Sequence, residues 1–414
     1  MTIVPHYLFA LSINDHVDSI GYIEARNSYF GSAGTKWQMV ERWRPTLQVK
    51  TRRSKFVLTL DGQLTQGRYL TGEYLSRVDN QLETLLPPGL DGTQPTLDEL
   101  IDDCAWNVST NRTYKTFDEV FKTARLFVDL NTPAVDLRIG RQAVNWGSAK
   151  FFNPTDVVPE NFIAEPWRER KGVNAFKANI PVGEEGLIST LLSTNDDFNA
   201  LQGAVKAGTT IQNTDIYGIL YGNNSHLMIG LDIKGERKIG WWAESAMYIS
   251  WDENQQHLKT SVGADYSFPV MQQLTVGLQL FHDGSGEIPT LYEWSSRTIL
   301  DIADCPKYNI EVPPRGKQRQ TLGRWYIMAD QYLTMSNTWT MSNVVLLNVA
   351  DRTGMIFPTV TYHGKAISFT GGAQMIFGKD GEFNPPSVQT TQLGIDFGDL
   401  LPTWTIQTWA RYNY

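Results

Sequence analysis

Charged side chains at alternating positions of otherwise apolar segments are the residues of this chain best suited to chemistry. In the first third of the chain and at its C-terminus they are arginines, namely Arg26, Arg42, Arg44, Arg125, Arg138 and Arg411. Between about residues 225 and 400 they are acids, namely Asp232, Glu244, Asp265, Asp330 and Asp396. Alternate residues of a strand share one face of a sheet. Such groups attract or repel polar solutes by charge.

Two arrangements of these charges are open. If the sheet closes, its first and last strands are neighbours, so the arginines gather on one wall and face the acids across a wet lumen. The resulting transverse field would favour anionic or zwitterionic solutes. Alternatively, each charge is paired with a nearby opposite charge, which the sequence supplies as Glu24, Asp61, Asp129, Asp136, Lys234 and Lys259.

A second group of polar residues surrounds the end of one strand. The run Leu137 to Gly147 (LRIGRQAVNWG) ends in Trp-Gly and is followed by Phe151 to Pro159 (FFNPTDVVP), whose Asn-Pro-x-Asp turn leaves the sheet abruptly. The charged stretch that follows continues to about residue 171. We expect residues 148–171 to fold into the lumen as a constriction that involves Arg141, Gln142, Asp156 and Arg168.

The sequence contains no recognisable motif of an enzyme active site. None of the six histidines sits beside a recognisable nucleophile motif, and Gly-x-Ser-x-Gly, His-Glu-x-x-His, phosphate-loop and Cys-x-x-Cys-His patterns are absent from the sequence. An outer-membrane hydrolase is therefore without support. We expect no enzyme activity, no cofactor and no metal site.

The two cysteines, Cys104 and Cys305, each fall in a long irregular stretch. A disulfide between them and two unpaired thiols both remain open. Neither cysteine has a histidine or a second cysteine at metal-ligand spacing.

The elements that must position these groups are strands of about ten residues. The C-terminal segment places Trp404, Ile406 and Tyr412 on one face and Gln407, Arg411 and Asn413 on the other. A repeated apolar-out, polar-in pattern is typical of a membrane barrel, because only a closed sheet satisfies its backbone in hydrocarbon. A large soluble all-β protein is the alternative. No apolar stretch is long enough for a membrane helix, and the net charge of -8 argues against nucleic acid as a partner.

The pattern gives nineteen strand candidates, one too many for an even-numbered barrel. We predict a single all-β, transmembrane antiparallel barrel of about 18 strands, with 16 or 20 as alternatives, short periplasmic turns and long extracellular loops. Residues 1–15 would form an N-terminal periplasmic segment and residues 16–414 the barrel. The opening residues lack a basic n-region, so we expect a signal peptide to have been removed.

The run LRIGRQAVNWG with FFNPTDVVP resembles a segment of porin-like outer-membrane proteins of proteobacteria, and more weakly the Gly-Arg-Gln strand of alginate-export barrels. The resemblance covers about 25 of 414 residues. It implies a bacterial outer-membrane channel with Arg138, Arg141, Gln142 and Asp156 near its constriction. It also implies lipid, lipopolysaccharide and the barrel-assembly machinery as partners.

The sequence thus predicts a porin for passive passage of small hydrophilic solutes, with a weak preference for anionic or zwitterionic ones. The alternative is a barrel scaffold that sheathes a partner, such as a multihaem electron carrier, in a lumen wide enough to hold it. An inward fold of residues 148–171 would leave no room for such a partner. A monomer and a homotrimer both remain open.

Overall fold

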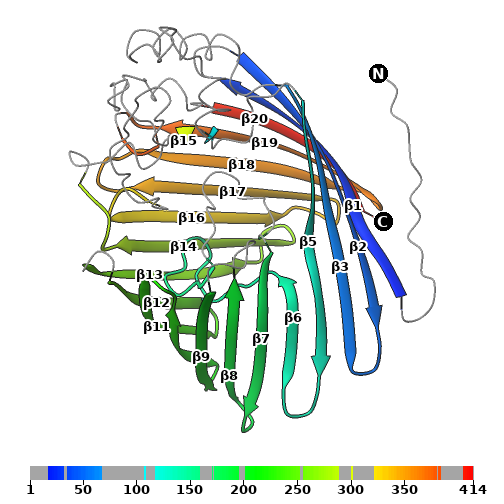
Figure 1. The fold of residues 1–414 in the computed structure, drawn as a ribbon. Coiled ribbons are helices and arrows are strands. Elements are labelled where there is room, and N and C mark those ends of the chain that lie inside the picture. Colours follow the sequence, from blue (N-terminus) through cyan, green and yellow to red (C-terminus); the bar gives the residue numbers. More distant parts are fainter. Residues whose placement is uncertain are drawn as a thin grey trace, which may run out of the picture.

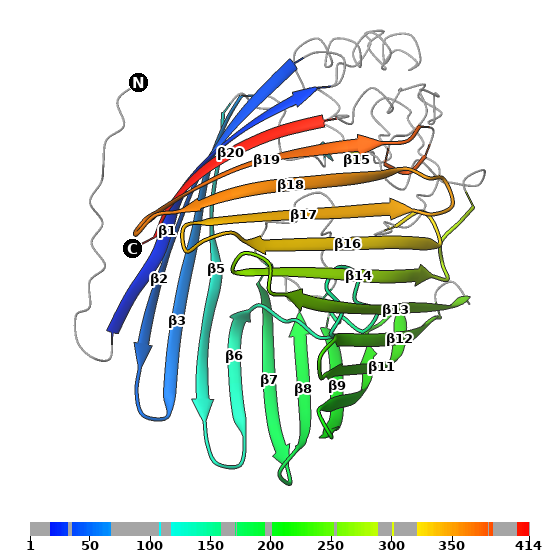
Figure 2. The same cartoon turned by 180° about the vertical axis from the view of Figure 1, so that it is seen from behind.

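The computed structural model of the chain describes residues 17–31, 35–67, 107–108, 117–158, 170, 172–194, 201–251, 255–288, 300–301, 321–379, 381–383 and 404–413. Eighteen of the strands in this part form one antiparallel sheet (Figures 1 and 2). They are β1 (Val17–Gly31), β2 (Thr35–Lys50), β3 (Ser54–Gly67), β5 (Phe117–Asn131), β6 (Asp136–Gln142), β7 (Val173–Val182), β8 (Gly186–Thr194), β9 (Leu201–Ile211), β10 (Thr214–Gly222), β11 (His226–Glu236), β12 (Gly240–Ser250), β13 (Gln255–Phe268), β14 (Gln273–Asp283), β16 (Trp325–Thr334), β17 (Trp339–Asn348), β18 (Gly354–His363), β19 (Ile367–Phe377) and β20 (Trp404–Asn413).

The sheet is closed. Each strand pairs with its neighbours along the chain, and β1 also pairs with β20 in a register that runs from Tyr22↔Asn413 to Gly31↔Trp404. The predicted barrel of eighteen strands is confirmed. The barrel sheet contains eighteen strands, so one of the nineteen candidates from the sequence was wrong.

The two rims of the barrel differ. At one rim, which we call the short-turn rim, the connections are residues 51–53, 132–135, 183–185, 212–213, 237–239, 269–272, 335–338 and 364–366. The start of β1 and the end of β20 lie at the same rim, because Val17 pairs near the end of β2 and the Asn413 N–H donates to Ala366 O. The long connections after β3, β6, β14 and β19 all leave from the opposite, long-connection rim (Figure 1).

The two faces of the sheet also differ. On β14, Val276, Leu278 and Leu280 are 39, 53 and 47% exposed, whereas Gln279 and Phe281, which alternate with them, are buried. Exposed aromatic side chains lie at strand ends at both rims, as Trp251, Trp325 and Trp404 at the long-connection rim and Trp241, Trp339 and Tyr412 at the short-turn rim. An aliphatic band between two aromatic girdles is the outer surface of a membrane barrel.

Two short strands lie outside the barrel sheet. Strands β4 (Asn107–Val108) and β15 (Leu300–Asp301) pair antiparallel and join the long connection after β3 to the one after β14. In the described part of the chain, no helix is long and apolar enough to span a membrane. The predicted N-terminal segment 1–15 lies outside the described residues.

Candidate functional site

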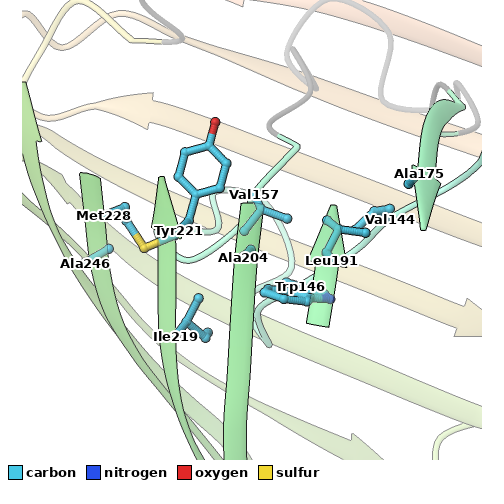
Figure 3. Packing of buried hydrophobic residues seen from close by; sticks show 10 residues of the cluster. All are labelled: Val144, Trp146, Val157, Ala175, Leu191, Ala204, Ile219, Tyr221, Met228 and Ala246. Atoms are coloured by element: carbon cyan, nitrogen blue, oxygen red, sulfur yellow. The ribbon is translucent and has the colours of Figure 1, made fainter. Parts of the chain in front are cut away.

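The chain that leaves β6 folds back against the barrel wall. We call residues 143–158 the inward segment. Its Val144, Trp146 and Val157 pack in one buried cluster with side chains of six successive strands (Figure 3), namely Ala175, Leu191, Ala204, Ile219, Tyr221, Met228 and Ala246. These wall residues alternate with the exposed aliphatic ones along their strands. The inward segment therefore lies on the inner face of the closed sheet.

A single buried carboxylate on β12 holds much of the inward segment. Glu244 is 1% exposed and accepts hydrogen bonds from the Ser148 N–H, the Ala149 N–H at 2.5 Å and the Thr155 hydroxyl at 2.8 Å. The Thr155 N–H adds a longer bond of 3.3 Å. Hydrogen bonds to an ionised acceptor are about twice as strong as neutral ones. These donors replace the water that Glu244 loses on burial.

Three further strands bind the tip of the inward segment. Gln279 Oε1 on β14 accepts from the Lys150 N–H at 3.0 Å and the Phe151 N–H at 3.2 Å, and its Nε2 donates to Phe152 O at 3.1 Å. Lys150 Nζ lies 3.0 Å from Asp265 on β13 and 3.2 Å from Asp330 on β16. The segment is thus held along the wall from β12 to β16.

An ion pair closes the base of the inward segment. Arg170 Nη1 donates to Asp156 Oδ2 at 2.7 Å and to Val144 O at 2.9 Å, and Arg125 donates to Arg170 O. Asp156 also accepts from the Trp146 and Val158 N–H groups. Burial raises the pKa of Asp156 to about 6, although the Arg170 charge opposes this shift.

Four of the predicted arginines gather at the seam where the barrel closes. Glu24 on β1 lies between Arg42 on β2 and Arg411 on β20 in the strand register. Its carboxylate, 2% exposed, accepts from Arg26 at 2.8 Å and from Arg411 at 2.6 and 2.8 Å. Arg42 donates to Gln63 Oε1 at 3.1 Å and lies 3.5 Å from Asp61. Arg44, which is buried, pairs in register with Tyr22.

The arginines of β5 and β6 have structural contacts. Arg138 binds Asp129 through two hydrogen bonds of 2.5 and 3.0 Å. Arg141 follows Gly140, whose φ of +119° interrupts the regular alternation of β6. Gln142 is fully buried and donates to Ala175 O at 3.0 Å, so it secures the start of the inward segment to β7.

The predicted acidic residues that the structure describes are bound by other groups of the protein. Asp232 is 1% exposed and binds Lys206 on β9 at 2.9 Å. Glu244, Asp265 and Asp330 all bind the inward segment. The cations that bind three of these acids are Lys150 and Lys206, not the Lys234 and Lys259 that the local-pairing alternative named, and the acids that bind the inward segment form a docking surface for it. Asp396, Arg168, Cys104 and Cys305 lie outside the described residues.

Several residues of this site were not found from the sequence. Lys206 is a solitary inward lysine in an apolar strand, and that isolation was a usable signal. Lys150 and Gln279 carry no local signal, because their roles depend on the path of the inward segment across four strands, β12, β13, β14 and β16. Among the described residues, no group of three or more histidine, cysteine or acidic side chains could hold a metal ion.

Solved structures with a similar fold are outer-membrane proteins. The chain superimposes on OprD of Pseudomonas aeruginosa with a TM-score of 0.50 and 11% identity, over 96% of this chain and 94% of that one. This chain shares the barrel fold of OprD. OccK8 (OprE) of the same organism gives a TM-score of 0.53 with 6% identity, over 96% of this chain and 98% of that one. OccAB1 of Acinetobacter baumannii gives 0.51 with 9% identity, over 98% of both chains. No protein-family model and no curated protein matches the sequence.

Proposed function

We propose that this protein is an outer-membrane channel for the passive passage of small hydrophilic solutes. The observation that carries the proposal is a polar segment bound inside a closed sheet whose outer face is aliphatic. A barrel of this kind satisfies its backbone without water, and its lumen accepts polar groups. The fold shared with the outer membrane protein OprD supports the same location for this chain.

The inward segment is the proposed constriction. Residues 144–157 are held by side chains of β12, β13, β14 and β16, so they keep a fixed position inside the barrel. A fixed obstruction sets the size of solute that passes. The part of the predicted constriction that contains Arg168 lies outside the described residues, and its contribution stays a prediction.

A weak preference for anionic or zwitterionic solutes is proposed for the same lumen. At the seam, Arg26 and Arg411 bind Glu24, Arg42 lies beside Asp61, and Arg44 follows Arg42 by two positions on β2. Four cations against two anions give this part of the wall a positive potential, which attracts anionic groups. The acids of the opposite wall are partly compensated by Lys150 and Lys206.

The inward segment favours a channel over a scaffold for a partner protein. It covers the inner face from β7 to β16, which is the surface that an inserted electron carrier would have to occupy. No catalytic step is proposed for the residues of this site.

The test is single-channel conductance of the purified protein in a planar bilayer, with reversal potentials measured under a salt gradient. We expect discrete conductance steps with a modest anion preference. Replacing Arg42 and Arg44 by alanine should reduce that preference, because two inward charges are lost. Replacing Lys50, an exposed lysine at the short-turn rim that binds Asp18 at 2.8 Å, should leave it unchanged. A silent membrane despite confirmed insertion would overturn the proposal.

A further inference from the structure

A second part of the chain also enters the barrel. Residues Gly381, Glu382 and Phe383, which we call the second inward segment, belong to the long connection between β19 and β20. Glu382 is 1% exposed and accepts from the Leu322 N–H at 3.0 Å, from Asn348 Nδ2 at 2.7 Å and from the Tyr326 hydroxyl. The segment is thus fixed by polar contacts to the start of β16 and the end of β17.

The backbone of the second inward segment is fixed as well. The Glu382 N–H donates to Asp351 Oδ2 at 2.7 Å, and the Phe383 N–H donates to Thr353 Oγ1 at 3.1 Å. Both acceptors belong to the turn between β17 and β18. A short segment with its carboxylate and two successive amides bound has little freedom to move independently of the wall.

The two inward segments meet at one aromatic cluster. Phe383 packs with Phe152, the residue at the tip of the inward segment, in a buried group that contains Phe281, Tyr326, Met328 and Leu346. The rings of Phe152 and Phe281 are stacked with centroids 4.8 Å apart, and the Phe152 and Tyr326 centroids are 5.8 Å apart. Tyr326 therefore contacts Phe152 through its ring and Glu382 through its hydroxyl.

We propose that Tyr326 couples the two inward segments, so that the second inward segment positions the constriction. The inference rests on the proposed channel, because its functional consequence is that the width of the pore depends on both segments. Tyr326 is fully buried, and its ring is held in place by a hydroxyl bond to a carboxylate that is itself anchored. In a close-packed interior, a displaced ring leaves space into which Phe152 moves.

The first test is amide hydrogen exchange of the folded protein in detergent micelles. Tyr326→Phe keeps the ring and removes the bond to Glu382, together with the bond of 2.6 Å that the hydroxyl accepts from the Gly323 N–H. We expect the Lys150 and Phe151 amides, which directly precede Phe152, to exchange about tenfold faster in this variant, because their local opening becomes easier. Phe383→Leu, which keeps an apolar side chain, provides the second variant if Tyr326→Phe does not fold.

Tyr221→Phe is the matched control. Tyr221 is also buried, packs against the inward segment, and bonds to Gln202 at 2.8 Å and Asn223 at 3.1 Å, none of which belongs to the second inward segment. Exchange at Lys150 and Phe151 should not change in this variant. Equal acceleration in both tyrosine variants, or in neither, would overturn the coupling.

A double-mutant cycle separates the coupling from the channel itself. The combined effect of Phe152→Ala and Glu382→Gln on exchange should differ from the sum of the single effects, since coupled residues are not additive. Additive effects in a conducting protein would overturn the coupling and leave the channel standing. Non-additive effects in a protein that never conducts would support the coupling and overturn the channel.

Discussion

The Glu244 carboxylate lies directly against the backbone of Gly147. A Cβ added to Gly147 would sit 2.8 Å from Glu244 Oε2 and 2.9 Å from Oε1, and the Gly147 φ of +96° is one that other residues rarely adopt. The glycine thus lets the chain turn off the strand and lets its next amides reach the carboxylate. The Trp-Gly pair, which the sequence suggested as the end of a strand, lies four residues beyond the end of β6 at Gln142 and has this specific consequence for the inward segment.

Gly147→Ala is expected to loosen the inward segment by about 1–3 kcal/mol, because it adds backbone strain and a clash with Glu244. The channel should show more current fluctuation, and the Ser148 and Ala149 amides should exchange faster. Gly183→Ala is the control, since Gly183 has a φ of +65° in a turn with no atom within 4 Å of the added Cβ. Equal behaviour of the two variants would show that the contact with Glu244 is unimportant.

Glu24→Gln is expected to increase anion selectivity. Glu24 neutralises part of the charge of Arg26 and Arg411, so the variant leaves more positive potential at the seam. The measurement is the reversal potential under a salt gradient, which should shift further toward the anion potential. Asp18→Asn, at the solvent-exposed pair with Lys50, should produce no shift. An unchanged potential for Glu24→Gln would contradict the proposed role of the seam arginines.

Docking of the inward segment should be tighter at pH 5 than at pH 7.5. The docked carboxyl of Asp156 has a pKa of about 6, above the value of a solvated aspartate, so the docked state binds the proton more strongly. Its extra stability is complete below about pH 4 and is lost as the pH rises through 6, a change on the order of 3 kcal/mol.

Amide exchange at Trp146 and Val158, corrected for the intrinsic pH dependence, measures the effect on docking. Protection should fall between pH 5 and pH 7.5 in the natural protein. In Asp156→Asn the fall should disappear, since the amide does not titrate. A natural protein with constant protection over this range would refute the role of Asp156.

Cys104 and Cys305 are predicted to form a disulfide. Both lie outside the described residues, but Asn107 and Asp301 pair directly in the small β4–β15 sheet. Cys104 precedes Asn107 by three residues and Cys305 follows Asp301 by four, so each cysteine is close in sequence to one residue of this pair. Mass spectrometry of the unreduced, denatured protein after alkylation should find neither thiol labelled. Labelling of both would favour the alternative of two free thiols.

Leu278→Arg should destabilise the folded barrel in lipid by about 2–4 kcal/mol, because a charge on the outer face costs most at mid-bilayer. Leu278 is 53% exposed near the middle of β14. Ile211→Arg, equally exposed but at the end of β9, should cost about 0–1 kcal/mol. Denaturant unfolding in vesicles measures both. Similar costs at the two positions would argue against a membrane-spanning orientation of the strands.

The barrel could be predicted from the sequence because its signal is local. Alternation within each strand, as in Leu278, Gln279 and Leu280, depends only on period two and survives an error in strand number. The adjacency of Arg411 and Glu24 also followed, since closure makes the first and last strands neighbours. The excess strand candidate arose because alternation by itself does not report pairing.

The contacts of the inward segment could be predicted only in part. A strand that ends in Trp-Gly and Asn-Pro indicates a departure from the sheet, and Asp156 was identified by that turn. The partners of the segment were not found, because contacting residues are far apart in the sequence. Glu244 on β12 binds the Ala149 N–H from 95 positions away, and no local pattern encodes the path that brings the segment to this strand. The contact of the second inward segment with Tyr326 also joins residues that are far apart in the sequence, so no local pattern predicts it.

The pairing of β1 with β20 has a consequence for the order of events in biogenesis. Strands β1 and β20 are far apart in the sequence and must find each other, so a chain in which they are unpaired carries two open edges that invite pairing with other molecules. Arg411 reaches Glu24 only when the final strand has the correct register, because a slip of one residue would turn the arginine toward lipid. The Arg411–Glu24 contact therefore forms only in a chain whose β20 is paired with β1 in the correct register.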